Sequence, residues 1–339
     1  MRRALLLCAL AALLVGCGAA VEVHERDLVV ATPAPDAEPS AQRPAPRPAG
    51  LAIAVVTHGQ AASGFWAIVK NGIDAAARAA DVTAVYRSPD IYSVTRMRQL
   101  IDQAVATRPD GLVVSIPSPA LGGAIRRAVR AGIPVISINS GSDVFRRLGV
   151  LAHVGQPEGR AGEAAGRRLA AMGVRHALCI NHEVGNAGTD ARCRAFARAI
   201  RGAGGTSRLV AVDVRDPRVG RRQLRAALAD RGVDGLLTLS SDGAQAALDA
   251  LRTRDPANRI AFGTFDLSPE ILHALKAGRI AFAIDQQAYL QGYVPILLLS
   301  QFARYGLLPA RGRVIATGPH FVTRGTADQA LRLSQLGIR

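Results

Sequence analysis

Polar side chains suited to binding a small molecule recur directly after short apolar runs of this chain. Such positions are His58, Asn139, His182–Glu183, Ser240–Asp242 and Asp266. Phe65 and Trp66 stand out beside them, because aromatic residues make up only 4% of the chain and Trp66 is its only tryptophan. Imidazole, amide and carboxylate groups can hydrogen-bond hydroxyls, and a flat aromatic ring can stack on an apolar ligand face. These residue types therefore indicate non-covalent recognition of a hydroxyl-rich ligand.

Motifs of covalent catalysis and of nucleotide binding are missing from the sequence. It contains no G-x-S-x-G elbow, no P-loop and no G-x-G-x-x-G segment after a strand. His182 and Glu183 could be an acid–base pair, but adjacent loop residues usually diverge. No His/Cys cluster has metal-ligand spacing. We therefore expect no enzyme, no cofactor and no metal, with an extracytoplasmic enzyme kept as an alternative.

Strand-like and helix-like segments alternate beyond residue 50. The expected strands are Leu51–Thr57, Val82–Tyr86, Gly111–Ile116, Pro134–Ile138, Ala177–Asn181, Leu209–Val214, Gly235–Leu239, Ile260–Phe265 and Ile280–Ile284. The expected helices are Gly64–Ala80, Ser93–Thr107, Pro119–Ala131, Gly159–Met172, Thr189–Ala203, Val219–Arg231, Gly243–Arg254 and Ser268–Lys276, and Val294–Leu299 is read as buried helix. This repeat predicts an α/β fold of doubly wound, Rossmann-like parallel sheets.

A break in the alternation divides the chain into two sheets. His153–Gln156 is a brief extended piece, and a second strand–helix series starts beyond it. Ligands of such sheets bind beyond the carboxyl ends of the strands. Two facing sheets would therefore gather the polar residues around one cleft.

The N-terminus predicts export from the cytoplasm. Arg2 and Arg3 precede the apolar run Ala4–Val15, which has the length of a signal sequence and is short for a membrane span. The run ends in Gly16-Cys17, where a bacterial lipoprotein signal is cut and Cys17 takes the lipid. Residues 1–17 are thus the expected signal, and residues 18–50, rich in Pro and Ala, the expected tether. An ordinary secretory signal is the alternative.

The net charge of +16 does not indicate a nucleic-acid partner. It comes almost entirely from arginines along helix faces, without interleaved aromatic residues, so we expect no nucleic-acid partner.

Two cysteines remain in the mature chain, because Cys8 leaves with the signal and Cys17 takes the lipid. Cys179 and Cys193 remain in an oxidising compartment, as a disulfide or as two buried thiols.

Five segments resemble one known family. They are Gly64–Gly72, Arg108–Val114, Ala131–Ile136, Gly263–Asp266 with Ala274–Arg279, and Asp285–Gln287 with Gln291–Tyr293. In order and spacing they resemble the ribose-binding-like group of type I periplasmic binding proteins of ABC importers. The likeness extends from about residue 51 to residue 330.

The resemblance implies two lobes joined by three hinge crossovers. The crossovers are expected near His153–Gln156, Asp285–Gln287 and Ile315–Gly318. The N-terminal lobe would contain residues 51–153 and 288–316, and the C-terminal lobe residues 154–286 and 317–339.

The resemblance also assigns residue roles. Phe65 and Trp66 align with the stacking pair, Asp266 with a hydroxyl-accepting aspartate and Gln286 with a hinge glutamine. Arg192 is the preferred contact from its helix, with Asp190 the alternative in another register, and Ser140 replaces an arginine that often follows Asn139. The expected ligand contacts are Phe65, Trp66, Asn139, Arg192, Asp266, Gln286, His58, His182, Glu183 and Ser241.

The resulting hypothesis is a monomeric solute-binding lipoprotein of the cell envelope. It would lie on the periplasmic or extracytoplasmic face and deliver a monosaccharide, sugar derivative or polyol to an ABC permease. A module of the same kind that reports to a sensor kinase or chemoreceptor is an alternative. Repressors with similar lobes carry an N-terminal helix-turn-helix, where this chain has its signal and tether.

Overall fold

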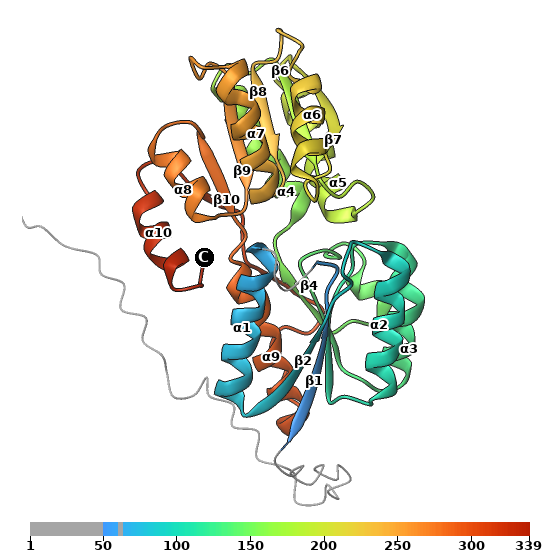
Figure 1. Cartoon of the computed structure of the whole chain (residues 1–339). Helices are drawn as coiled ribbons and strands as arrows, with labels where there is room; N and C mark the ends of the chain where they lie inside the picture. Colours follow the sequence, from blue (N-terminus) through green and yellow to red (C-terminus); the bar gives the residue numbers. More distant parts are fainter. Residues whose placement is uncertain (1–49, 60–63) are drawn as a thin grey trace, which may run out of the picture. The chain divides into compact units, whose positions relative to one another are not determined.

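The computed structural model describes residues 50–59 and 64–339, which form two α/β lobes (Figure 1). The expected signal, the lipidated Cys17 and the tether up to residue 49 lie outside the described residues. Each lobe is built on one six-stranded sheet with helices on both faces. Residues far apart in sequence contribute to each sheet, so both lobes contain several segments of the chain.

The first sheet consists of parallel strands in the order β11-β5-β4-β3-β1-β2. Its strands are β1 (Leu51–Val56), β2 (Val82–Arg87), β3 (Gly111–Ser115), β4 (Val135–Ile138), β5 (Ala152–Gly155) and β11 (Val314–Ala316). Helices α1 (Gly64–Ala80) and α9 (Ala288–Tyr305) cover one face, and α2 (Val94–Ala106) and α3 (Gly122–Arg130) cover the other. The central β3 is buried along its whole length, as expected for a strand covered on both faces.

The second sheet has the order β12-β10-β9-β8-β6-β7 and one antiparallel pair. Its strands are β6 (His176–Asn181), β7 (Thr206–Ala211), β8 (Gly235–Thr238), β9 (Ala261–Phe265), β10 (Phe282–Asp285) and β12 (His320–Val322). Its helices are α4 (Glu158–Ala171), α5 (Ala187–Gly202), α6 (Pro217–Ala227), α7 (Ser241–Arg254), α8 (Pro269–Lys276) and α10 (Ala327–Gln335). Helices α4 and α5 pack on one face, and α6, α7, α8 and α10 on the other.

The chain passes between the two sheets at three places in the described residues. These are the links from β5 to α4, from β10 to α9, and from β11 to β12. The last link contains a cis peptide bond between Gly318 and Pro319. Each link is short, so the carboxyl ends of the strands of both sheets lie next to the connecting segments.

The predicted α/β class with two doubly wound lobes is confirmed, with two local corrections. Strand β7 runs from Thr206 to Ala211 and not from Leu209 to Val214, because it is an edge strand whose residues are all exposed or half-buried and give no continuous apolar signal. Strand β12 and helix α10 had no strong apolar signal, and β12 makes the second sheet mixed. The segment Val294–Leu299, expected as helix, is confirmed as part of α9. Of the helices described, none combines the length and the apolar character that a membrane crossing requires.

Candidate functional site

A cavity of about 830 Å³ lies between the carboxyl ends of the strands of the two lobes. All ten residues expected to contact a ligand line it: His58, Phe65, Trp66, Asn139, His182, Glu183, Arg192, Ser241, Asp266 and Gln286. The parallel strands produce this convergence, because each of their loops and helix starts opens at the same edge. The cavity is therefore the candidate ligand site.

Aromatic rings form the wall on the side of the first lobe. Phe65 and Trp66 belong to the first turn of α1, and their ring centroids lie 5.1 Å apart in an edge-to-face arrangement. His58, two residues after β1, meets the Trp66 ring edge-on at 4.9 Å and the Tyr92 ring at 5.9 Å. Trp66 is buried and Phe65 half-buried. This packing fixes the rings, and a fixed ring can receive the apolar face of a cyclic ligand.

Asn139 and Asp266 occupy matching positions in the two lobes, directly after β4 and β9. Both have left-handed backbone conformations, with φ of 59° and 68°. Asn and Asp adopt this conformation more readily than other non-glycine residues. The Nδ2 of Asn139 donates to Gln291 Oε1 at 3.3 Å, and its Oδ1 accepts from the hydroxyl of Ser140 at 3.1 Å. The turn thus aims both side chains at the cavity.

Arg192 lies at the base of the cavity on the second lobe, held by a buried network. Its Nε lies 2.5 Å from Oε2 of Glu158 and its Nη2 lies 2.8 Å from Oε1. Nη2 also donates to Gln286 Oε1 at 2.8 Å, and Gln286 Nε2 donates to Asp266 Oδ1. The guanidinium lies 4.4 Å from the centroid of the Phe265 ring. Only Nη1 is without a partner among the described residues, so Arg192 has one nitrogen to offer a ligand.

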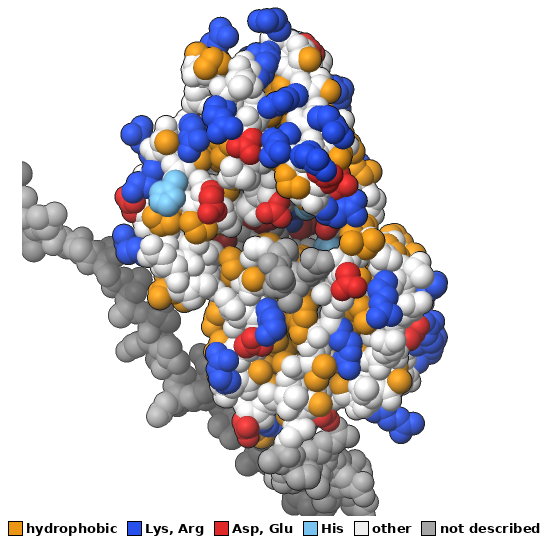
Figure 2. All heavy atoms as spheres, in the orientation of Figure 1, with side chains coloured by type: hydrophobic (Ala, Val, Ile, Leu, Met, Phe, Trp, Pro, Cys, Tyr) orange, Lys and Arg blue, Asp and Glu red, His pale blue; other side chains and the backbone are white. Residues whose placement is uncertain are grey.

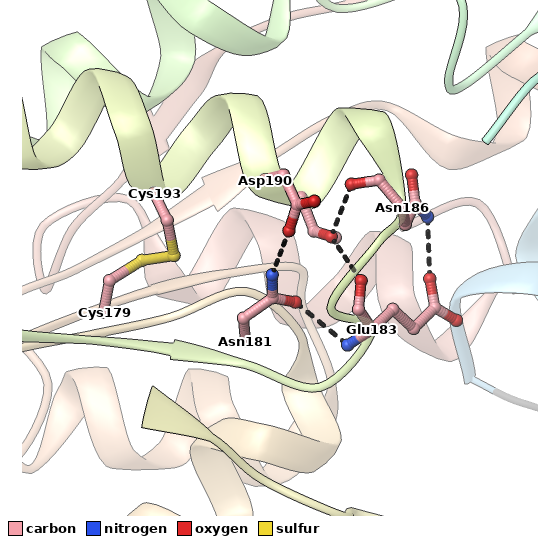
Figure 3. The surroundings of a disulfide bond; sticks show 7 residues. Cys179, Asn181, Glu183, Asn186, Asp190 and Cys193 are labelled. Atoms are coloured by element: carbon pink, nitrogen blue, oxygen red, sulfur yellow. Dashed lines mark hydrogen bonds between the residues drawn. A yellow bond between two sulfur atoms is a disulfide. The ribbon is translucent and has the colours of Figure 1, made fainter. Parts of the chain in front are cut away.

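Asp190, the alternative in another register, supports the loop instead. It accepts a hydrogen bond from Asn181 Nδ2 at 2.8 Å (Figure 3) and another from the backbone N–H of Gly185 at 3.1 Å. Its carboxylate therefore holds the segment between β6 and α5 in shape, and Asp190 is not among the residues that line the cavity.

Burial shifts the protonation of the acidic and basic groups around the cavity. It raises the pKa of Asp266 to about 7, against the opposing effects of Arg192 and Gln286. Burial also lowers the pKa of His58 and of His182, and the charge of Glu183 only partly counteracts it. The pKa of Glu183 is lowered: burial acts to raise it, but the two histidines and the hydrogen bond from Asn186 outweigh burial. At neutral pH both histidines are thus neutral and Glu183 is ionised.

A disulfide joins the strand and the helix on either side of the β6–α5 loop. It connects Cys179 in β6 with Cys193 in α5 across 14 positions of the sequence (Figure 3). Asn186 caps α5 by accepting a hydrogen bond from the Gly188 N–H at 3.0 Å, and its Nδ2 donates to Glu183 Oε2 at 2.8 Å. The loop that carries Glu183 is therefore anchored at both ends.

The same loop connects the two lobes directly. Asn186 Nδ2 lies 3.2 Å from His58 Nε2, and Asn186 Oδ1 accepts from the Ser140 hydroxyl at 3.1 Å. The backbone N–H of Ala187 donates to the carbonyl of Pro117 at 2.8 Å. Residues of both lobes thus meet beside the cavity.

Further lining residues come from two loops that the sequence reasoning did not use. They are Asp90 and Tyr92 after β2, and Asp213 and Arg215 after β7. Asp242, which the sequence places after a strand, also lines the cavity, from the first turn of α7. The same signal, a polar residue soon after a strand, could have found Asp90. Asp213 was hidden because the strand was placed three residues too late. In the described part of the chain, no group of three or more His, Cys, Asp or Glu residues could hold a metal ion.

Comparison with known proteins gives consistent matches over most of the chain. A family profile described as "periplasmic binding protein domain" matches residues 53–306. The xylose/arabinose-binding protein XylF of Sulfolobus acidocaldarius is 27% identical over 294 residues, which cover 80% of this chain and 71% of that protein.

Solved structures also match. A carbohydrate transporter from Acidothermus cellulolyticus, crystallised with myo-inositol, is similar with a TM-score of 0.80 and 32% identity, over 86% of this chain and 100% of that one. A periplasmic sugar-binding protein from Legionella pneumophila has a TM-score of 0.71 at 23% identity, over 79% of this chain and 99% of that one. The second match supports the fold alone.

Proposed function

Because the chain belongs to the type I periplasmic binding protein family, we propose that it captures a monosaccharide, sugar derivative or polyol between its lobes and delivers it to an ABC permease. One observation carries the ligand class: a single cavity is lined by an aromatic pair on one lobe and by Arg192, Asp266 and Gln286 on the other. A cyclic polyol has an apolar ring face and an edge of hydroxyls, so it needs both kinds of wall. A relative named for xylose and arabinose and a carbohydrate transporter crystallised with myo-inositol support this class.

Capture would stabilise a closed arrangement of the lobes. A ligand that contacts Phe65 and Asn139 on one lobe and Arg192 and Asp266 on the other gains all its contacts only when the lobes meet. That difference in affinity between open and closed forms drives closure. The closed pair of lobes would then dock on the permease. No covalent step is required, and relatives named as binding and transport proteins support a role without catalysis.

The location of the protein is part of the same proposal. We infer a lipid anchor on Cys17, a tether up to residue 50, and a monomer that works on the extracytoplasmic face of the membrane. A chain that reports to a sensor kinase or a chemoreceptor would use the same cavity, so the identity of the membrane partner separates the two roles.

Titration of the purified protein with sugars and polyols tests the function. We expect at least one neutral monosaccharide or cyclitol to bind with a stoichiometry of one, to raise the melting temperature and to change the fluorescence of Trp66. Trp66→Phe provides the control, because it removes the only tryptophan signal and keeps an aromatic ring. Failure of every sugar, polyol and amino-sugar derivative to bind would refute the proposal.

A further inference from the structure

The cavity is acidic although the chain has a formal net charge of +16. Five carboxylates and two guanidinium groups line it: Asp90, Glu183, Asp213, Asp242, Asp266, Arg192 and Arg215. Figure 2 shows acidic side chains along the gap between the lobes, whereas basic ones gather on the outer surface of the second lobe. The acidity is therefore a local property of this site and not a consequence of composition.

Both arginines are already neutralised by carboxylates. Arg192 forms an ion pair with Glu158, which lies outside the cavity lining, and Arg215 forms one with Asp213 at 2.8 Å. His58 and His182 add no positive charge at neutral pH, because burial lowers the pKa of each. Within the described residues, the other four carboxylates of the lining have no Arg or Lys partner.

Asp266 is the most buried of these four residues. Its side chain is 8% exposed, and only its Oδ1 accepts a hydrogen bond, from Gln286. Its Oδ2 has no partner in the described part of the chain. A buried carboxylate is costly, because a charge in a low-dielectric environment loses its hydration. Arg192, which is held by Glu158, offsets only part of this cost, and the pKa of Asp266 remains raised to about 7. A positively charged ligand group would stabilise the ionised form of Asp266 further.

Two buried polar atoms in the lining are also unpaired. Among the residues that the structure describes, the Nδ1 of His182 and the hydroxyl of Tyr92 have no hydrogen-bond partner. A neutral histidine can accept a hydrogen bond at one ring nitrogen, a tyrosine hydroxyl can accept or donate one, and an ionised carboxylate only accepts. The unfilled capacity of the site is thus mainly for donors. An ammonium group offers three donors and no acceptor, whereas a hydroxyl offers one donor and two acceptor lone pairs.

We propose that the cavity selects a cyclic polyol that carries an amine, an amino sugar or an aminocyclitol, over the counterpart with a hydroxyl at that position. This inference rests on the proposed function and specifies its ligand. The ammonium group binds Asp266, and the ring stacks on Phe65 and Trp66, whose faces also attract cations. Phosphorylated or carboxylated sugars are excluded by the carboxylates of the lining.

Calorimetric titration with matched ligand pairs tests the selectivity. The pairs are myo-inositol with an aminodeoxyinositol, glucose with glucosamine, and galactose with galactosamine, each joined by the N-acetylated, uncharged form. We expect the amine of at least one pair to bind about tenfold more tightly than the hydroxyl form, because hydrogen bonds to charged groups are about twice as strong as neutral ones. The N-acetylated form should lose this advantage.

Two variants locate the effect. Asp266→Asn should reduce the amine-to-hydroxyl affinity ratio to about one, since it removes the charge and keeps the shape. Asp102→Asn should leave the ratio unchanged, because Asp102 is an exposed residue of α2 that pairs with Arg127 away from the cavity. If Asp266→Asn does not fold, the comparison of ligands on the unaltered protein still tests the selectivity, because it needs no variant.

The outcomes separate this inference from the proposed function. Equal or weaker binding of every amine relative to its hydroxyl counterpart overturns the selectivity and leaves sugar capture intact. Binding of none of these compounds overturns both. A tenfold preference that persists in a folded Asp266→Asn variant overturns the assignment of the ammonium group to Asp266.

Discussion

Replacing Glu158 by glutamine should destabilise the second lobe severely. Glu158 is 5% exposed at the start of α4, and it holds Arg192, which is 3% exposed, through two hydrogen-bonded contacts. Burial disfavours the charged form of Arg192, yet its pKa is raised, because the neighbouring Glu158 charge outweighs burial. Glu158→Gln removes that charge and leaves a cation in the interior of the lobe.

The expected loss follows from the burial of both partners. Breaking a buried ion pair by removing one charge costs about 3–5 kcal/mol. The amide of glutamine can still accept one hydrogen bond, so we expect about 3 kcal/mol. For a domain of this size, 1 kcal/mol shifts the melting temperature by about 2–4 °C. Glu158→Gln should therefore melt roughly 6–12 °C below the unaltered protein, by the same conversion.

A control on the same helix makes the measurement specific. Glu163 of α4 forms an exposed pair with Arg167, four residues later, and Glu163→Gln should cost about 0.3–0.5 kcal/mol. Urea unfolding followed by circular dichroism gives both values. The double variant Glu158→Leu/Arg192→Met should regain most of the stability lost in Glu158→Gln, since both charges of the pair are removed together. Equal losses in the Glu158→Gln and Glu163→Gln variants would refute the account of the network.

Three further predictions concern pH, the disulfide and the contact between lobes. Burial raises the pKa of Asp266 from 3.8 to about 7, so the folded state keeps a proton that the unfolded state releases, and the protein loses stability as the pH rises through this range. Between about pH 4 and pH 8, the stability of Asp266→Asn in urea unfolding should therefore rise by up to about 4 kcal/mol relative to the unaltered protein. A stability difference between the two proteins that does not change with pH would contradict this. Reduction of the Cys179–Cys193 disulfide, or the Cys179→Ala/Cys193→Ala variant, should lower the free energy of unfolding by about 3 kcal/mol, because the disulfide closes a loop of 14 positions. An unchanged melting temperature would argue against the disulfide. Asn186→Ala should lose the cap of α5, which costs about 1 kcal/mol of stability. It should also lose the contacts with His58 and Ser140 of the other lobe, so that the ligand-free variant has a larger radius of gyration in X-ray scattering. An unchanged radius of gyration would show that these contacts do not hold the lobes together.

The fold was predictable because buried parallel strands have a strong local signal. The runs at Gly111–Ser115 and Gly235–Thr238 are apolar and buried throughout, and glycines or prolines stand close to them. Edge elements lack that signal, because one side of the strand meets solvent. This explains the displaced β7, whose Leu209 is exposed, and the unpredicted β12.

The positions of the site residues were predictable, but their bonding was not. A polar residue after a parallel strand must lie at the ligand edge of the sheet, as Asn139 and Asp266 do. The pairing of Arg192 with Glu158 joins two helices across 34 positions of the sequence. No local pattern encodes such a contact, so sequence alone left Arg192 with its whole guanidinium free for a ligand. The acidic balance of the cavity depends on that pairing.

A crystal structure of the protein with a bound cyclic polyol tests the central claim most directly. The account predicts one ligand in the cavity, its ring against Phe65 and Trp66 and its polar groups on Arg192 and Asp266. A ligand that contacts only one lobe, or that binds outside this cavity, would contradict the capture of solute between the lobes.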